Sequence, residues 1–166
     1  MTRLVNHALN QCNSYCCIKG SLGMKVLVIF FTVLILGCST GRPANLGITD
    51  GKLLPCPDSP NCVSSQSQEK RHFIEPIRYE GDQQRAMNRL ITVIKGMKRS
   101  KIETVTDVYV HAEFTSAVFR FVDDAEFYID DNTKTIHMRS ASRIGYSDLG
   151  VNRKRLEEIR SMFNAR

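Results

Sequence analysis

An apolar run near the N-terminus decides which part of the chain can form a folded domain. The eleven residues Val26 to Leu36 are apolar apart from one threonine, and a lysine precedes them. A membrane-spanning helix needs about 20 such residues, so this run is too short to cross a bilayer and matches the apolar centre of a secretory signal peptide. We therefore expect residues 1–37 to be a signal segment that is removed. The chain that remains to fold then begins at Cys38.

The end of this run, Ile35-Leu36-Gly37-Cys38, resembles the lipobox of bacterial lipoproteins. The resemblance implies cleavage after Gly37 and a lipid, including palmitate, on Cys38. Ser39 follows, and in such proteins a residue other than Asp at this place implies sorting to the outer membrane. We expect an outer-membrane lipoprotein of the bacterial cell envelope that faces the periplasm. The alternatives are a signal anchor and a buried hydrophobic segment.

The residues on either side of this signal indicate the translation start, the tether and the globular domain. Residues 1–23 place three cysteines ahead of the signal and do not resemble a folded unit, so Met24 is a better translation start than Met1. Residues 38–53 are predicted to be a lipid-anchored tether without fixed structure, because Gly, Pro, Thr and Asn occur from Ser39 to Leu53 with little periodicity. Residues 54–166 are predicted to be the globular domain.

The composition of residues 38–166 fits one domain of ordinary size. Three of the six net positive charges lie before Cys38, where there is no acid, so the remaining chain carries only +3. This mild excess gives no indication of nucleic-acid binding. Only Cys56 and Cys62 remain beyond Cys38, and an oxidising periplasm favours a disulfide between them. A reactive or metal-binding thiol pair is the alternative.

The apolar pattern predicts an α+β fold of order β-α-β-β-β-β-α. Apolar residues recur at spacings of three and four after Asp82, the expected N-cap, and stop near Gly96, which indicates an amphipathic helix. A second helix is expected over 152–164, with Leu156, Ile159, Met162 and Phe163 inward. The predicted strands are 72–79, 102–107, 109–116, 119–129 and 135–140, with a tight turn at 130–133. They form an antiparallel sheet with one helix-covered face.

The first polar cluster is the loop from Cys56 to Gln66, which is either a staple for the tether or a binding surface. The second contains Asp123, Asp124 and Glu126 within a strand. Asp124 and Glu126 share a sheet face, while Asp123 points the opposite way. Two carboxylates on one face can hold a hard cation or act as acid and base. Alternatively, they form ion pairs with nearby arginines or protect a sheet edge.

The third cluster runs from a strand through a glycine-bearing turn into a helix N-terminus. Backbone donors, hydroxyl groups and guanidinium groups are what an anionic ligand requires. The candidate binding residues are Arg139, Ser140, Ser142, Arg143, Asp148, Asn152 and Arg155. In the alternative interpretation, Ser147, Asp148 or Asn152 caps the helix, and the arginines pair with Asp123, Asp124 and Glu126.

No catalytic or metal-binding motif is apparent in the sequence. His72, His111 and His137 are widely separated, so we expect no metal site and no cofactor. The chain contains no Gly-x-Ser-x-Gly, no Walker-type glycine loop and no His-Glu-x-x-His. A Cys–His nucleophile would require Cys56 or Cys62 to be unpaired.

Three strings, CPDSPNCVSS at 56–65, FVDDAE at 121–126 and RSASRIGYSDLGVNRKR at 139–155, are similar to the signatures of a domain-of-unknown-function family. That family occurs in bacterial envelope proteins, many of them lipoproteins, with cyanobacterial and plastid relatives. The resemblance covers nearly all of residues 54–165. It implies one extracytoplasmic domain with the three polar clusters as its site, and it supplies no reaction.

We therefore expect a non-enzymatic, lipid-anchored envelope protein that binds a small anionic ligand or an envelope partner. Arg139, Ser140, Ser142 and Arg143 would make the contacts, with Asp123, Asp124 and Glu126 orienting the arginines. The first alternative is an envelope hydrolase or metal-dependent enzyme that uses Asp124 and Glu126, which then must line an open pocket away from arginines. The second is a structural or assembly protein.

Overall fold

The computed structural model describes residues 45–165. The predicted signal segment, the lipid site at Cys38 and the first part of the tether lie outside the described residues. Within residues 45–165, no helix is both long enough and apolar enough to cross a membrane.

One antiparallel sheet has the strand order β3-β8-β7-β6-β5, and β4 pairs with β8 as well. Its strands are β3 (Cys62–Ser64), β4 (Ile77–Arg78), β5 (Ser100–Val105), β6 (Tyr109–Thr115), β7 (Val122–Asp130) and β8 (Thr135–Ser142). The β7–β8 turn is the predicted tight turn, in which the Asp130 carboxylate accepts from the Asn132 backbone N–H and the Thr133 hydroxyl.

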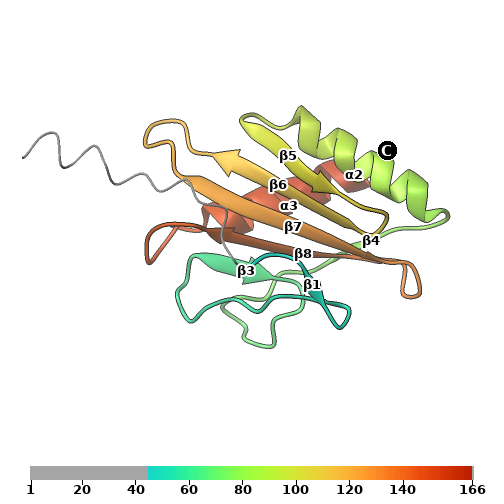
Figure 1. The fold of residues 1–166 in the computed structure, drawn as a ribbon, viewed down its shortest axis with the longest axis horizontal. Helices are drawn as coiled ribbons and strands as arrows, with labels where there is room; N and C mark the ends of the chain where they lie inside the picture. Colours follow the sequence, from blue (N-terminus) through green and yellow to red (C-terminus); the bar gives the residue numbers. More distant parts are fainter. Residues whose placement is uncertain (1–44, 166) are drawn as a thin grey trace, which may run out of the picture. The chain divides into compact units, whose positions relative to one another are not determined.

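Two helices pack against one face of this sheet, as Figure 1 shows, and the α+β prediction is confirmed. Helix α2 (Gln83–Gly96) lies beside β5, and α3 (Val151–Asn164) lies beside β8. Asp82 caps α2, as predicted, by accepting from the Arg85 backbone N–H at 3.0 Å. Leu90 and Ile94 of α2 and Leu156 and Ile159 of α3 are fully buried in the core.

The sheet differs from the prediction before α2. Residues 72–79 were predicted to be one strand, but only Ile77–Arg78 pairs as β4. The backbone N–H groups of His72 and Phe73 instead bond to the Glu69 carbonyl in a turn, and Pro76 has no N–H to donate to a ladder. Strand β3 lies within the polar segment predicted to be a loop.

The tether prediction is wrong for its last residues, because β1 (Ile48–Thr49) and β2 (Lys52–Leu53) form a short hairpin. The hairpin packs against β7 and β8, and the Leu53 backbone N–H donates to the Gln66 side chain at 2.8 Å. A second correction concerns α3, where Met162 was predicted to face inward but is 39% exposed.

The core packing of α2 gives the first prediction. Leu90→Ala removes a fully buried side chain and should lower the free energy of unfolding by about 2–5 kcal/mol, because a cavity remains. Urea unfolding followed by circular dichroism measures this change. Lys95→Ala on the exposed face of the same helix should stay within about 0.5 kcal/mol. Equal effects of the two variants would contradict this packing.

Candidate functional site

Two polar clusters lie on opposite faces of strands β7 and β8. The face away from the helices carries the outer cluster, which consists of Tyr109, His111, Glu113, Asp124, Glu126, Arg139 and Arg143. The helix-covered face carries the inner cluster, which consists of Asp123, Ser140, Ser142, Asn152 and Arg155. Strand alternation separates Asp123 from Asp124 and Glu126 in the predicted way.

The ion pair between Glu126 and Arg139 is the most deeply buried part of the outer cluster. The two residues are 0% and 1% exposed, and Arg139 Nη1 donates to Glu126 Oε2 at 2.7 Å. Glu126 Oε1 accepts from the Tyr109 hydroxyl and from the Gly47 backbone N–H, both at 2.7 Å. Both carboxylate oxygens therefore have partners, as a buried charge requires.

Tyr109 acts as a donor to this carboxylate. Burial, the charge of Glu126 and the hydrogen bond to Glu126 together raise the pKa of the Tyr109 hydroxyl. Because the hydroxyl therefore stays protonated, it can continue to donate to the carboxylate.

Asp124 forms the second ion pair of the outer cluster. Its carboxylate accepts from Arg143 Nε at 2.8 Å and from Arg143 Nη2 at 2.7 Å, and His111 Nε2 lies 2.7 Å from Oδ1. Arg143 also pairs with Glu113. Burial would raise the pKa of the Asp124 carboxyl, but the hydrogen bonds and charges of Arg143 and His111 outweigh it and lower that pKa.

The inner cluster is centred on Asn152, which is fully buried near the start of α3. Its Oδ1 accepts from the Ser140 hydroxyl and from Arg155 Nη1, both at 2.6 Å, and its Nδ2 donates to the Ser142 hydroxyl at 3.0 Å. Arg155 also pairs with Asp123 at 2.7 Å. All the polar side-chain atoms of Asn152 are thus used inside the protein.

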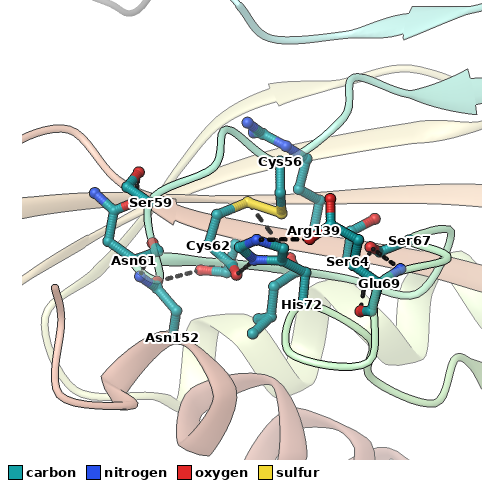
Figure 2. The surroundings of a disulfide bond; sticks show 12 residues. Cys56, Ser59, Asn61, Cys62, Ser64, Ser67, Glu69, His72, Arg139 and Asn152 are labelled. Carbon is teal, nitrogen blue, oxygen red and sulfur yellow. Dashed lines mark hydrogen bonds and ion pairs between the residues drawn. A yellow bond between two sulfur atoms is a disulfide. The ribbon is translucent and has the colours of Figure 1, made fainter. Parts of the chain in front are cut away.

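The start of α3 is fixed by Asp148 and by the disulfide loop. The Asp148 carboxylate accepts from the backbone N–H groups of Gly150 and Asn152, which matches the capping alternative. Asn61 Nδ2 donates to the Gly145 carbonyl at 2.6 Å, and the Asn61 carbonyl accepts from Asn152 Nδ2 at 3.0 Å, as Figure 2 shows for Asn61 and Asn152. The first and third sequence clusters therefore meet at Asn61.

The Cys56–Cys62 disulfide is present, as predicted, and His72 lies beside it (Figure 2). His72 is 2% exposed, and its Nδ1 lies 2.8 Å from the Cys62 carbonyl oxygen, which makes Nδ1 the donor. Nε2 has no hydrogen-bond partner among the described residues and lies 3.9 Å from the Glu69 carboxylate. A hollow of about 590 Å³ adjoins these groups.

A groove of about 600 Å³ lies between the α2–β5 turn, the end of β6 and α3. Its apolar lining comes from Met97, Phe114, Val151 and Met162. Four cations line it as well, namely Lys98, Arg99, Lys154 and Arg155, together with the acid Glu158. Arg155 stacks on the Phe114 ring at 4.7 Å and keeps its ion pair with Asp123. The groove therefore combines an excess of positive charge with apolar side chains.

Residues 52–163 match the model of a family described as "Protein of unknown function (DUF1499)". The chain belongs to this family. The DUF1499 match spans β2, the whole six-stranded sheet and nearly all of α3, and so includes both polar clusters and the groove. A search of curated proteins found no match.

The carboxylates in this DUF1499 domain do not have the geometry that the hydrolase hypothesis requires. Asp124 and Glu126 are at most 2% exposed, and each faces an arginine. A general acid or base must come within hydrogen-bond reach of its substrate. Within residues 45–165, no group of three or more His, Cys, Asp or Glu side chains could hold a metal ion.

Sequence reasoning missed the β6 residues that complete the outer cluster. Tyr109, His111 and Glu113 alternate with the buried apolar residues of β6, so their shared face was visible as a period of two. Their partners on β7 follow only from the register, which places Glu126 opposite His111 and Asp124 opposite Glu113. The cations of the groove outside α3, Lys98 and Arg99, gave no sequence signal.

The lowered pKa of Asp124 gives the second prediction. Since the carboxyl pKa is lower in the folded state than the unfolded value of about 4, its pairing stabilises the fold at neutral pH. That contribution is lost as the pH falls from about 4 through the folded-state pKa. Asp124→Asn should therefore cost about 3 kcal/mol at neutral pH, and the difference from the parent should shrink in acid.

Urea unfolding over a series of pH values measures this difference. Asp58→Asn is the control, because the Asp58 side chain is fully exposed, and it should change stability by less than about 0.5 kcal/mol. A cost for Asp124→Asn that is independent of pH would contradict the role assigned to the carboxylate charge.

Proposed function

We propose that this DUF1499 protein is an outer-membrane lipoprotein of the bacterial envelope that faces the periplasm and binds a small anionic ligand in the cationic groove. The observation that carries the proposal is that Lys98, Arg99 and Lys154 gather around one hollow, to which Arg155 adds a guanidinium that is already paired with Asp123. Phosphate or carboxylate groups accept charge-assisted hydrogen bonds from such side chains. The proposed role is binding and not catalysis.

The pairing of Arg139 and Arg143 with carboxylates favours the groove, and not the end of β8, as the binding site for the anion. Arg139 and Arg143 were expected to contact the ligand, but their charges are already opposed by Glu126, Asp124 and Glu113. An anion at these arginines would also lie against buried carboxylates, which repel it. Among the described residues, no ion pair involves Lys98, Arg99 or Lys154.

Arg155 links the strand-to-helix turn to this groove. Of the candidate binding residues named from the sequence, it is the one that lines the hollow. The inner cluster holds its guanidinium in place through Asn152 and Asp123. Ser140, Ser142 and Asn152 thus position a residue of the proposed site without contacting the ligand themselves.

The ligand proposal gives the third prediction. Inorganic phosphate and glycerol phosphate should bind the purified protein, as measured by isothermal titration calorimetry at low salt. The double variant Lys98→Gln/Lys154→Gln should bind them about tenfold or more weakly, because two charge-assisted contacts are lost. Both side chains are exposed, so the fold should be retained, which circular dichroism checks.

Lys95→Gln is the matched control, because Lys95 is an exposed lysine of α2 that does not line the groove. An equal loss of binding in this control would show that the effect is one of net charge alone. Unchanged binding in the double variant would contradict the groove as the site.

The anchoring proposal gives the fourth prediction. In bacteria fed a palmitate analogue that can be detected after gel electrophoresis, the protein should be labelled and found in the outer-membrane fraction. Cys38→Ala should abolish both results, because the only proposed lipid site is removed. Cys17→Ala should leave both unchanged, since residue 17 lies in the segment that is expected to be absent or cleaved. Labelling that survives Cys38→Ala would contradict the proposal.

A further inference from the structure

Large hydrophobic side chains are exposed mainly at one end of the sheet. The β6–β7 turn carries Val118, Phe119 and Phe121, and the β8–α3 loop carries Ile144, Tyr146 and Leu149. Leu149 is 95% exposed and Phe119 is 73% exposed. Apolar side chains this exposed and this close together usually mark a surface that meets another apolar phase.

The two segments belong to the same surface, which we call the apolar end. Strand β7 begins where β8 finishes, and the Arg143 backbone N–H donates to the Val122 carbonyl at 3.2 Å. In Figure 1 the β6–β7 turn and the β8–α3 loop project from the same end of the sheet. Within the turn, the rings of Phe119 and Phe121 stack with centroids 5.5 Å apart.

The fold holds both segments in place from behind. The Ser116 backbone N–H donates to the Phe121 carbonyl at 2.8 Å, which closes the turn. Asn61 of the disulfide loop donates to the Gly145 carbonyl, and the Asp148 carboxylate accepts from the backbone N–H groups of Gly150 and Asn152 at the start of α3. The backbones of both segments are therefore fixed while the apolar side chains between these bonds point to solvent.

Cations outnumber acids around the apolar end. The acids Asp148, which caps α3, and Glu158, which lines the groove, form no ion pair among the described residues. Arg120 stands between Phe119 and Phe121 in the sequence, and Lys98, Arg99 and Lys154 line the neighbouring groove. The nearby acids Glu113 and Asp123 are already paired with Arg143 and Arg155. Exposed aromatic and aliphatic residues among cations match the interface of an anionic lipid bilayer, whose headgroups attract the cations and whose acyl region accepts the apolar tips.

We propose that the apolar end docks on an anionic lipid bilayer, with Phe119 and Leu149 at the depth of the headgroups. The inference rests on the proposed envelope location but not on a ligand in the groove. The tether fits it, because the chain is already fixed to the domain at Gly47, which bonds to Glu126. The nine residues 38–46 that precede this point can span at most about 32 Å when fully extended, so a lipid on Cys38 would keep the domain near the bilayer.

The absence of tryptophan from the sequence makes the proposal directly testable. Phe119→Trp places a single fluorophore in the apolar end of the full chain, and Val105→Trp places one in β5 at the opposite end of the sheet. Each purified protein is mixed with vesicles of phosphatidylglycerol or phosphatidylcholine that contain brominated acyl chains, which quench tryptophan at the bilayer.

We expect the Phe119→Trp reporter to shift to shorter wavelength and to be quenched by the phosphatidylglycerol vesicles, and less so by phosphatidylcholine. The Val105→Trp reporter should do neither. Adding Leu149→Ser to the Phe119→Trp protein should weaken the vesicle response about tenfold. Val105→Ser in the same background should not change it. These side chains are exposed, and circular dichroism checks that each variant is folded.

Equal quenching of the two reporters would overturn the proposal, because the protein would then lie on the bilayer without a preferred face. No quenching of the Phe119→Trp reporter would overturn it too. A blue shift that grows with protein concentration in the absence of vesicles would assign the apolar end to a second copy of the chain. Palmitate labelling and phosphate titration use no vesicles, so a failure of the proposed function is recognised separately.

Discussion

The structure depends on the pairing of charges that the outer face of the sheet buries. A lone carboxylate or guanidinium in this position would destabilise the fold by several kcal/mol, so Glu126 requires Arg139 and Asp124 requires Arg143. Pairing alone does not exclude water from these charges. The β1–β2 hairpin covers them because it packs against β7 and β8. The Gly47 backbone N–H then completes the hydrogen bonds of Glu126.

Periodicity predicted the fold because the helices and long strands each bury one face. The spacing of apolar residues gave α2 and its Asp82 cap, and the alternation gave β6, β7 and β8 close to their observed bounds. Strands β3 and β4 have at most three residues, which is too short for a pattern to emerge. The β1–β2 hairpin is stabilised by contacts with distant strands, which no local pattern reports.

The candidate site shows a different limit of sequence reasoning. The acids on β7 and the arginines after it were recognisable as one set, but whether a guanidinium faces a ligand or a carboxylate depends on strand register. Register also decides that His111 and Glu113 join that set. The groove combines Lys98 with Lys154 through the packing of α2 against α3, so residues more than 50 positions apart meet there.

The pairing of β3 with β8 has a consequence for the order in which the molecule assembles. The sheet places residues 62–64 against residues 139–141, and α3 then packs beside both strands. Contacts of such long range form slowly, because a large loop must close before they stabilise anything. A chain that enters a compartment from its N-terminus therefore cannot complete this sheet until nearly all of the chain has arrived. Until then the chain stays incompletely folded.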